Sequence, residues 1–85
     1  MLPDDQLAVI DTAAEETATA HRLLTEAATA LTAAHDRLNA AFGEHDSSGR
    51  VHATGSLQYV SDKTGHLRDC AAHTLYCLGR FRAED

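Results

Sequence analysis

The sequence predicts an all-α protein, a long antiparallel helical hairpin, and three observations lead to this prediction. Apolar and small residues recur alternately three and four residues apart along most of the chain, the spacing of a helix that packs along another helix. The one clear turn signal lies near the middle, in residues 43–49. Aromatic residues make up 5% of the 85 residues and proline occurs once, which disfavours a sheet or a disulfide scaffold. We therefore expect a single domain spanning residues 1–85.

The first helix is expected over residues 4–42. Pro3 suits a first helical turn, and Asp4 and Asp5 place negative charge at the positive end of the helix dipole. Gly43 is suited to end the helix in the left-handed conformation. We call the line of residues along which two helices meet the seam. Its expected members on this helix keep the three-and-four spacing throughout: Leu7, Ile10, Ala14, Thr17, His21, Leu24, Ala28, Leu31, His35, Leu38 and Phe42.

The second helix is expected over about residues 50–82, with the part from residue 56 onward most strongly indicated. Ser47 or Ser48 would cap an early start of this helix. Thr54 or Ser56 would cap a later one. The expected seam members on this helix again alternate three and four residues apart: Leu57, Val60, Thr64, Leu67, Ala71, Thr74, Leu78 and Phe81.

The large apolar residues of both seams are expected to hold the assembly together. These are Leu24, Leu31, Leu38, Phe42, Leu57, Leu67, Leu78 and Phe81. Beside the first seam an alanine recurs every seven residues, at Ala13, Ala20, Ala27, Ala34 and Ala41, and the flank expected beside the second seam is Lys63, Cys70 and Cys77. A hairpin covers one strip on each helix, so a second strip predicts a homodimer or larger assembly, such as an antiparallel four-helix bundle. A monomer with exposed alanines is the alternative, since alanine loses little by facing water.

The charge of the chain excludes some partners. Its net charge is −6 with seven Lys and Arg residues, whereas nucleic acids and acidic membrane surfaces are bound by clustered basic residues. We therefore expect no nucleic acid and no membrane as partner. The start of the chain is acidic and no apolar run has the length of a signal or membrane segment, so we expect a cytoplasmic protein, with export lacking a cleaved signal left open.

Four residues of the second helix carry metal-binding chemistry. His66, Cys70, His73 and Cys77 are spaced four, three and four residues apart, which places them on one helix face. Imidazole and thiolate are the ligands that zinc and copper(I) prefer. In a hairpin that turns at residues 46–48, residues whose numbers add to about 94 lie level, so His21 would be a third ligand. Alternatively, the cysteines fill a small-residue strip and the histidines form hydrogen bonds at its edge.

His21 and His35 occupy seam positions of the first helix. A polar group in a seam costs stability unless it finds a partner, but it fixes the helix register and the number of chains that associate. A second interpretation is a pH switch, because imidazole gains a proton in mild acid and a buried imidazolium is costly. Catalysis is not expected, since no glycine-rich loop or oxyanion donor accompanies Cys70 or Cys77.

Three short segments resemble the WXG-type proteins, small helical-hairpin proteins associated with type VII secretion. The start at residues 2–7 is similar to the starts of these proteins, and Phe42 and Gly43 lie at the turn where Trp-x-Gly stands in the family. Phe81 and Asp85 resemble the Tyr-x-x-x-acid export signal, with Phe in place of Tyr. The resemblance implies a helical hairpin that pairs with a second hairpin. From the residues themselves we expect no cofactor, with zinc or copper as the alternative.

Together these observations predict a non-enzymatic module for protein–protein interaction whose partner is a second copy of itself or another helical protein. The alternative is a helical bundle that binds zinc or copper through the His and Cys residues of the second helix.

Overall fold

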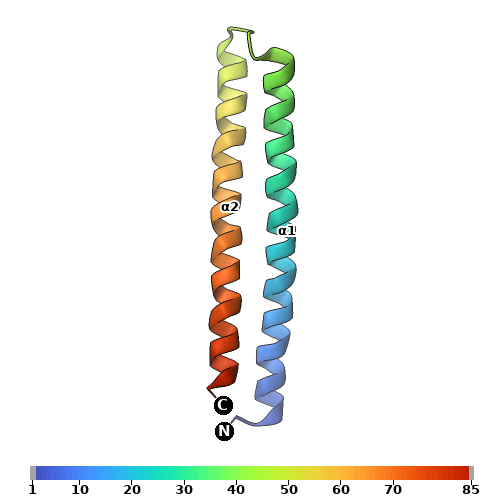
Figure 1. The fold of residues 1–85 in the computed structure, drawn as a ribbon, viewed down its shortest axis with the longest axis vertical. Coiled ribbons are helices and arrows are strands. Elements are labelled where there is room, and N and C mark those ends of the chain that lie inside the picture. The colour runs from blue at the N-terminus through green and yellow to red at the C-terminus, as the bar shows by residue number, and fades with distance from the viewer. Residues whose placement is uncertain (1, 85) are drawn as a thin grey trace.

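The two long helices lie side by side and antiparallel, joined at one end by a short turn (Figure 1). The structure is a computed structural model that describes residues 2–84. Met1, the first residue of the expected domain, and Asp85, the last residue of the domain and of the expected export signal, lie outside the described residues. Helix α1 spans Asp4–Phe42 and helix α2 spans Ser48–Ala83, and residues 2–84 contain no strand. The all-α helical hairpin predicted from the sequence is therefore confirmed.

The rod is thin for a protein of its length. It measures 63 × 14 × 14 Å and its radius of gyration is 18.9 Å, whereas a compact domain of this length has about 12 Å. Its width is that of two packed helices, so each helix has one neighbour and the rest of its circumference faces water.

Helix α1 begins and ends as its sequence suggests, except for the conformation of Gly43. Pro3 is the extended residue before the helix, and Asp4 and Asp5 lie in the first turn. Gly43 keeps right-handed angles, φ −57° and ψ −29°, so the expected left-handed ending was wrong. The glycine is needed for a close approach instead, because a Cβ there would lie 2.5 Å from the carbonyl oxygen of Asn39.

The turn occupies residues 43–47, and α2 uses the early of its two candidate starts. Ser47 is the N-cap, and its hydroxyl oxygen accepts a 3.1 Å hydrogen bond from the backbone N–H of Arg50. The Arg50 side chain donates back to the carbonyl oxygen of His45 at 3.0 Å. The first bond satisfies a backbone N–H group in the first turn of α2, and the second satisfies a carbonyl group of the preceding turn. They explain why the helix begins at Ser48 and not after Thr54 or Ser56.

The seam of α1 is the one that the sequence predicted, with one exception. Phe42 is exposed, since it lies at the end where the chain turns. The remaining predicted members are buried or half-buried: Leu7, Ile10, Ala14, Thr17, His21, Leu24, Ala28, Leu31, His35 and Leu38.

The seam of α2 differs from the predicted one at every second position. The expected members Val60, Leu67, Thr74 and Phe81 are exposed. The buried and half-buried positions that keep the three-and-four spacing are Arg50, Thr54, Leu57, Ser61, Thr64, Arg68, Ala71, Leu75 and Leu78. Both patterns share Leu57, Thr64, Ala71 and Leu78, so the helix is rotated about its axis relative to the expectation. As a result, Ser61 and Arg68 face α1 where Val60 and Leu67 were expected.

Polar contacts explain how α2 tolerates this rotation. The hydroxyls of Thr32 and Ser61 lie 3.2 Å apart across the seam. At the open end of the hairpin, Arg82 donates two hydrogen bonds to the carboxylate of Asp11, at 2.6 and 3.2 Å. These bonds lower the pKa of Asp11 below its ordinary value, since they favour the charged carboxylate. The residue numbers add to 93 in both pairs, which fixes the level at which the two helices face each other.

Candidate functional site

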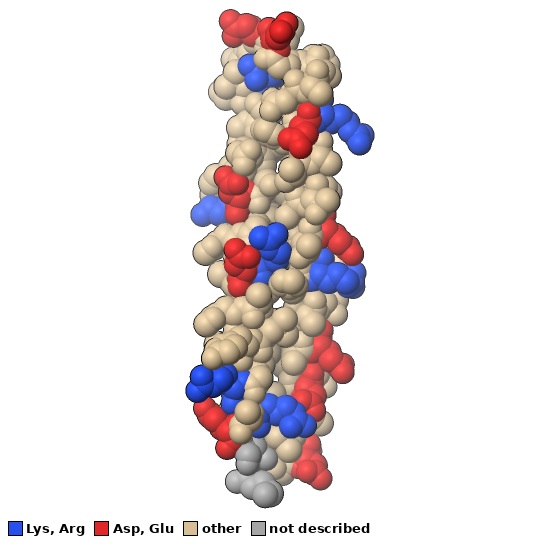
Figure 2. All heavy atoms as spheres, in the orientation of Figure 1, with Lys and Arg blue, Asp and Glu red and all other residues tan. Residues whose placement is uncertain are grey.

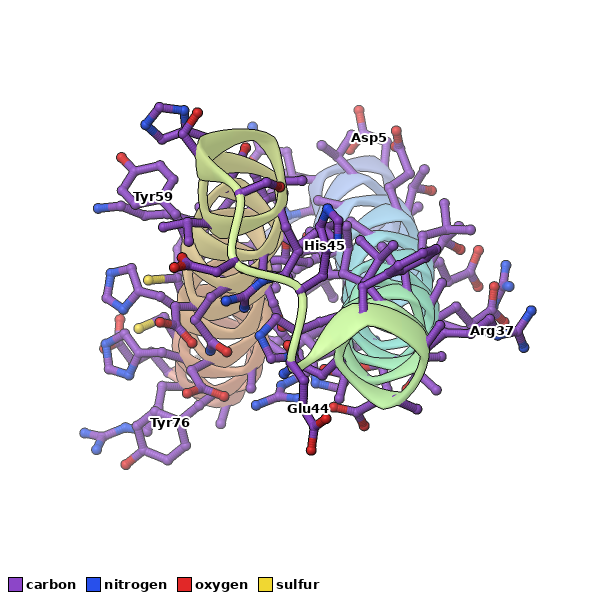
Figure 3. All side chains as sticks on the ribbon, turned by 90° about the horizontal axis from the view of Figure 1, so that it is seen from above. Asp5, Arg37, Glu44, His45, Tyr59 and Tyr76 are labelled. Atoms are coloured by element: carbon purple, nitrogen blue, oxygen red, sulfur yellow. The ribbon has the colours of Figure 1, made fainter. Side chains whose placement is uncertain are left out.

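The His and Cys residues of α2 form two matching pairs on the side of the helix that faces away from α1. The His66 Nε2 atom lies 3.6 Å from the Cys70 sulfur, and the His73 Nε2 atom lies 3.5 Å from the Cys77 sulfur. All four residues are exposed, and both cysteines are free thiols. In the view along the rod, the yellow sulfur atoms project outward from α2 (Figure 3). Each pair joins residues one helical turn apart, as the sequence predicted.

Aromatic and basic side chains of the same helix surround these pairs. The rings of His73 and Tyr76 stack with centroids 6.2 Å apart, and Arg80 donates a 3.2 Å hydrogen bond to the Tyr76 hydroxyl. Lys63 lies over the ring of Tyr59, 5.6 Å from its centroid. All these contacts are within α2, so the outer face of this helix is organised without help from α1.

Each His and Cys pair supplies two metal ligands and no more. Within residues 2–84, no group of three or more His, Cys, Asp or Glu side chains is placed to hold a metal ion. The two pairs are separated by one heptad, about 10 Å along the helix axis, so they do not share an ion. A tetrahedral zinc or copper site would need two further ligands from another molecule.

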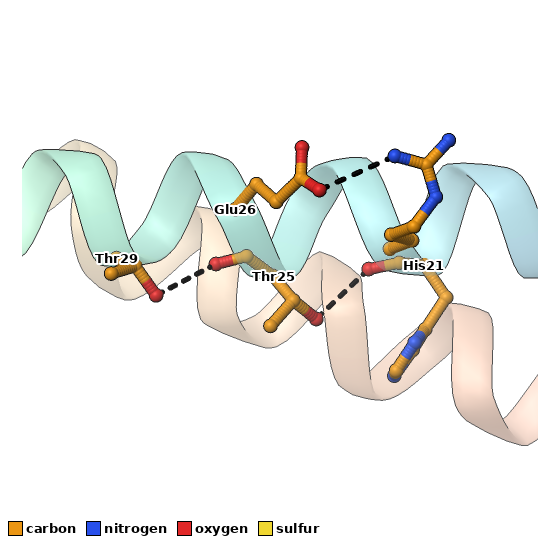
Figure 4. Close-up of polar contacts among 5 residues, drawn as sticks. His21, Thr25, Glu26 and Thr29 are labelled. Carbon is orange, nitrogen blue, oxygen red and sulfur yellow. Dashed lines mark hydrogen bonds and ion pairs between the residues drawn. The ribbon is translucent and has the colours of Figure 1, made fainter.

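His21 is not the third ligand that the sequence suggested. The expected level was nearly right, since facing residues add to 93, close to the 94 assumed. However, His21 is a half-buried member of the seam on α1, and its side chain is directed toward α2 (Figure 4). His73 and Cys77 lie on the opposite side of α2, so level positions do not meet.

The two seam histidines are half-buried, so water reaches both of them. The side chain of His35 is 22% exposed, and its Nδ1 atom lies 3.5 Å from the carboxylate of Asp36. Near His21, Thr25 donates to the His21 carbonyl oxygen at 2.9 Å, and Thr29 donates to that of Thr25 at 3.1 Å (Figure 4). The threonine hydroxyls are thus satisfied within α1. A register role or a pH response of the histidines stays a prediction.

The most extensive candidate site is an exposed apolar strip on α2 that the sequence had assigned to the seam. Leu67 is 54% exposed and Phe81 is 50% exposed, and they recur at intervals of seven with two other exposed residues. We define the α2 strip as Val60, Leu67, Thr74 and Phe81, and the alanine strip as Ala13, Ala20, Ala27, Ala34 and Ala41. In the alanine strip, three alanines are exposed, Ala20, Ala27 and Ala41, and Ala13 and Ala34 are half-buried.

Two exposed residues of α1 escaped the sequence prediction. Val9 is 68% exposed and Leu23 is 51% exposed, and both lie on the helix position next to the alanine strip. An open hollow of about 240 Å³ lies between Val9, Ile10 and Phe81, which places the end of the α2 strip beside α1. The signal that would have revealed Val9 and Leu23 is their spacing of fourteen residues, two heptads, outside the seam.

The face shown in Figure 2 has a different character. Basic and acidic side chains are spread along both helices on this face, and no large area of one sign is visible (Figure 2). Among the described residues, no helix is long and apolar enough to cross a membrane.

No family model matches the chain, and no curated protein and no solved structure matches it significantly. The resemblance to the WXG-type proteins therefore stays a prediction. Its expected turn residues, Phe42 and Gly43, lie where α1 ends.

Proposed function

We propose that this chain is a non-enzymatic interaction module, a helical hairpin that associates with a second helical hairpin into a four-helix bundle. The observation that carries the proposal is how little the single chain buries. Among residues 2–84, only Ile10 and Thr54 are buried, and Thr54 is polar. A lone hairpin therefore has almost no core of its own.

The exposed area supports the same proposal. The chain exposes 6098 Å², whereas a folded monomer of 9.1 kDa exposes about 4,900 Å². The excess is about 1,200 Å², and one partner in a stable protein–protein interface buries about 800 Å². Covering one face of the rod would bring the exposed area to the value expected for a folded chain.

The kind of residue left exposed favours association over solubility. Val60, Leu67 and Phe81 are large apolar side chains on one strip of α2. Scattered apolar residues are ordinary on a protein surface, but large apolar residues that share one face of a helix at multiples of seven residues are typical of a helix–helix interface. The helical face is suited to another helix, which packs along such a row.

The test is the mass of the untagged protein in solution, measured by native mass spectrometry and light scattering over a range of concentrations. We expect a metal-free dimer near neutral pH, with the monomer appearing only on dilution. A repeat in mild acid reports whether protonation of the histidines alters the assembly, and the variant H21Q/H35Q separates the two seam histidines from the other four. A monomer at the highest accessible concentration would refute self-association.

The paired His and Cys residues support a second candidate function, a metal site completed by another molecule. His66 with Cys70, and His73 with Cys77, each present a ring nitrogen and a sulfur at contact distance. Two such pairs from two molecules supply the four ligands of a tetrahedral zinc site. Zinc would then bind at one equivalent per two chains for each pair, and the double variant C70S/C77S would lose it. If the parent protein binds no zinc and C70S/C77S keeps the stability of the parent, the cysteines have a packing role instead.

A further inference from the structure

The alanine strip and the α2 strip lie on the same flank of the hairpin. The first four members of the alanine strip each directly precede a seam residue of α1, and Ala41 continues the same row. The first three members of the α2 strip each directly precede a seam residue of α2, and Phe81 precedes Arg82, which binds Asp11. In an antiparallel helix pair, positions that precede the seam lie on the same side. The hollow between Val9, Ile10 and Phe81 is a direct sign of this arrangement.

The other flank is polar and holds the contacts within the chain. Thr32 meets Ser61 there, and a shallow hollow beside Arg68 is lined by Ala28, Thr29 and Thr32. The polar contacts described between the helices, Thr32 with Ser61 and Asp11 with Arg82, leave the flank with the two strips open. It is the flank on which a partner would find an apolar surface.

The two strips match each other in height and complement each other in size. Facing residues of the hairpin have numbers that add to 93, so Phe81 lies level with Ala13, Leu67 with Ala27, and Val60 with Ala34, to within one residue. On α2, the larger side chains of the α2 strip, with Thr74 among them, thus run beside a row of methyl groups on α1 with the same spacing of seven residues. Side chains of unequal size pack best when large residues face small ones.

We infer that this flank binds a second copy of the chain through a two-fold axis parallel to the length of the rod. The inference rests on the proposed self-association and specifies its surface. Such an axis keeps every residue at its own height and exchanges the two rows. Leu67 of one copy then packs on Ala27 of the other, and Phe81 on Ala13. The turns of both copies lie at the same end.

The alternative two-fold axis, across the rod, gives poorer packing. It places alanine row on alanine row and the large side chains of α2 on one another. The first pair of helices would approach closely while the second pair would be held apart, leaving gaps that cost stability. The lengthwise axis gives both contacts the same separation.

A second copy fits this flank because each chain carries both halves of the contact. The area needed also agrees, since the excess exposed area of about 1,200 Å² exceeds the share of one partner in a standard interface. At the rim, Leu23 lies level with Cys70, since their numbers add to 93. Leu23 of one copy would therefore be covered by the Cys70 edge of the other, which accounts for its exposure in the single chain.

The experiment uses single cysteines in a C70S/C77S background. In the lengthwise dimer, position 20 of one copy lies beside position 74 of the other, since these numbers match the level of the two strips. Variants A20C and T74C are unfolded together, refolded as a mixture and treated with a short thiol crosslinker. In the mixture we expect a covalent dimer made of one A20C chain and one T74C chain. We expect no covalent dimer with A20C alone or with T74C alone.

A third variant, A27C, tests the alternative axis because position 27 is the midpoint of the alanine strip. Crosslinking of A27C to itself would show that the alanine strips face each other, and would overturn the lengthwise arrangement while leaving self-association intact. A dimer by mass with no crosslink in the A20C and T74C mixture would also overturn it. A chain that is monomeric in the C70S/C77S background and in the parent would refute self-association itself.

Discussion

Helices α1 and α2 have the same spacing of seam residues but differ in where they place their large apolar side chains. Helix α1 turns Leu24, Leu31 and Leu38 toward its neighbour. Helix α2 turns Ser61 and Arg68 toward α1 and leaves large apolar residues exposed on another side. The difference teaches that α1 places most of its large apolar side chains in the seam and leaves a row of alanines beside it, whereas α2 divides its large apolar side chains between the seam and the exposed α2 strip.

The largest effect is expected from a charge in the seam of α1. Leu31 is half-buried between the helices, and L31E would place a charged carboxylate in this apolar position. We expect a loss of about 3 kcal/mol or more in the free energy of unfolding, and with it most of the helicity. Circular dichroism during urea unfolding measures both. If helicity and oligomeric mass survive, the seam described for α1 is incorrect.

A charge in the α2 strip should act on association instead. Leu67 is 54% exposed in the single chain, so L67E leaves the contact between α1 and α2 in place. We expect the dissociation constant of the dimer to rise about 100-fold, the effect of losing a central apolar contact. Sedimentation equilibrium gives the constant.

The matched control for this change is V51E, because Val51 is an aliphatic residue of the same helix that is 50% exposed but lies outside the α2 strip. It should leave the dissociation constant within a few-fold of the parent value. Equal weakening by both variants would mean that the strip has no special part in association.

The contact between Asp11 and Arg82 gives a smaller effect that depends on pH. Because the pKa of Asp11 is lowered in the folded chain, its carboxylate stabilises the fold above the ordinary pKa of aspartate, about 3.9. This contribution is lost as the pH falls through the lowered pKa. Thermal unfolding of the parent and of D11N should therefore differ most near neutral pH and converge in strong acid. A constant difference at every pH would exclude the ion pair as its cause.

The smallest effects are expected at two glycines that the structure separates. Nothing lies within 4 Å of a Cβ built at Gly79 inside α2, so G79A should stabilise the chain by up to about 1 kcal/mol through helix propensity. The same change at Gly43 should destabilise it, since its Cβ would collide with the Asn39 carbonyl oxygen. Chemical unfolding of both variants checks the opposite signs. Stabilisation by G43A would show that the turn adjusts freely.

The sequence predicted the seam of α1 correctly because only one row of that helix combines leucines with unbroken spacing. On α2 two rows share Leu57, Thr64, Ala71 and Leu78, and the apolar alternates Val60 and Leu67 favoured the wrong row. Periodicity shows that a helix has an apolar face, but not which neighbour that face meets. The choice was made by contacts between distant residues, such as Thr32 with Ser61, and by the long side chain of Arg68, which tolerates a half-buried position.

The candidate site was predicted to a similar degree. The pairs of His66 with Cys70 and of His73 with Cys77 follow from helix geometry alone, and the structure places both at contact distance. The prediction that His21 is a third metal ligand was wrong because it used only the height of His21 along the rod and not the direction of its side chain. The exposed α2 strip was seen as a row of residues, but its role depended on the rotation of α2, which local sequence does not determine.

The position of the chain ends has a mechanical consequence. The N-terminal end of α1 and the C-terminal end of α2 lie at the same end of the rod, opposite the turn (Figure 1). The ion pair between Asp11 and Arg82 links the two helices near this end. A force that pulls these ends apart loads the contacts between the helices one at a time, beginning with this ion pair, as a zipper opens. A force applied along the rod to two associated copies would instead load a whole row of contacts at once. We expect the single hairpin to open at low tension and the pair of copies to resist sliding.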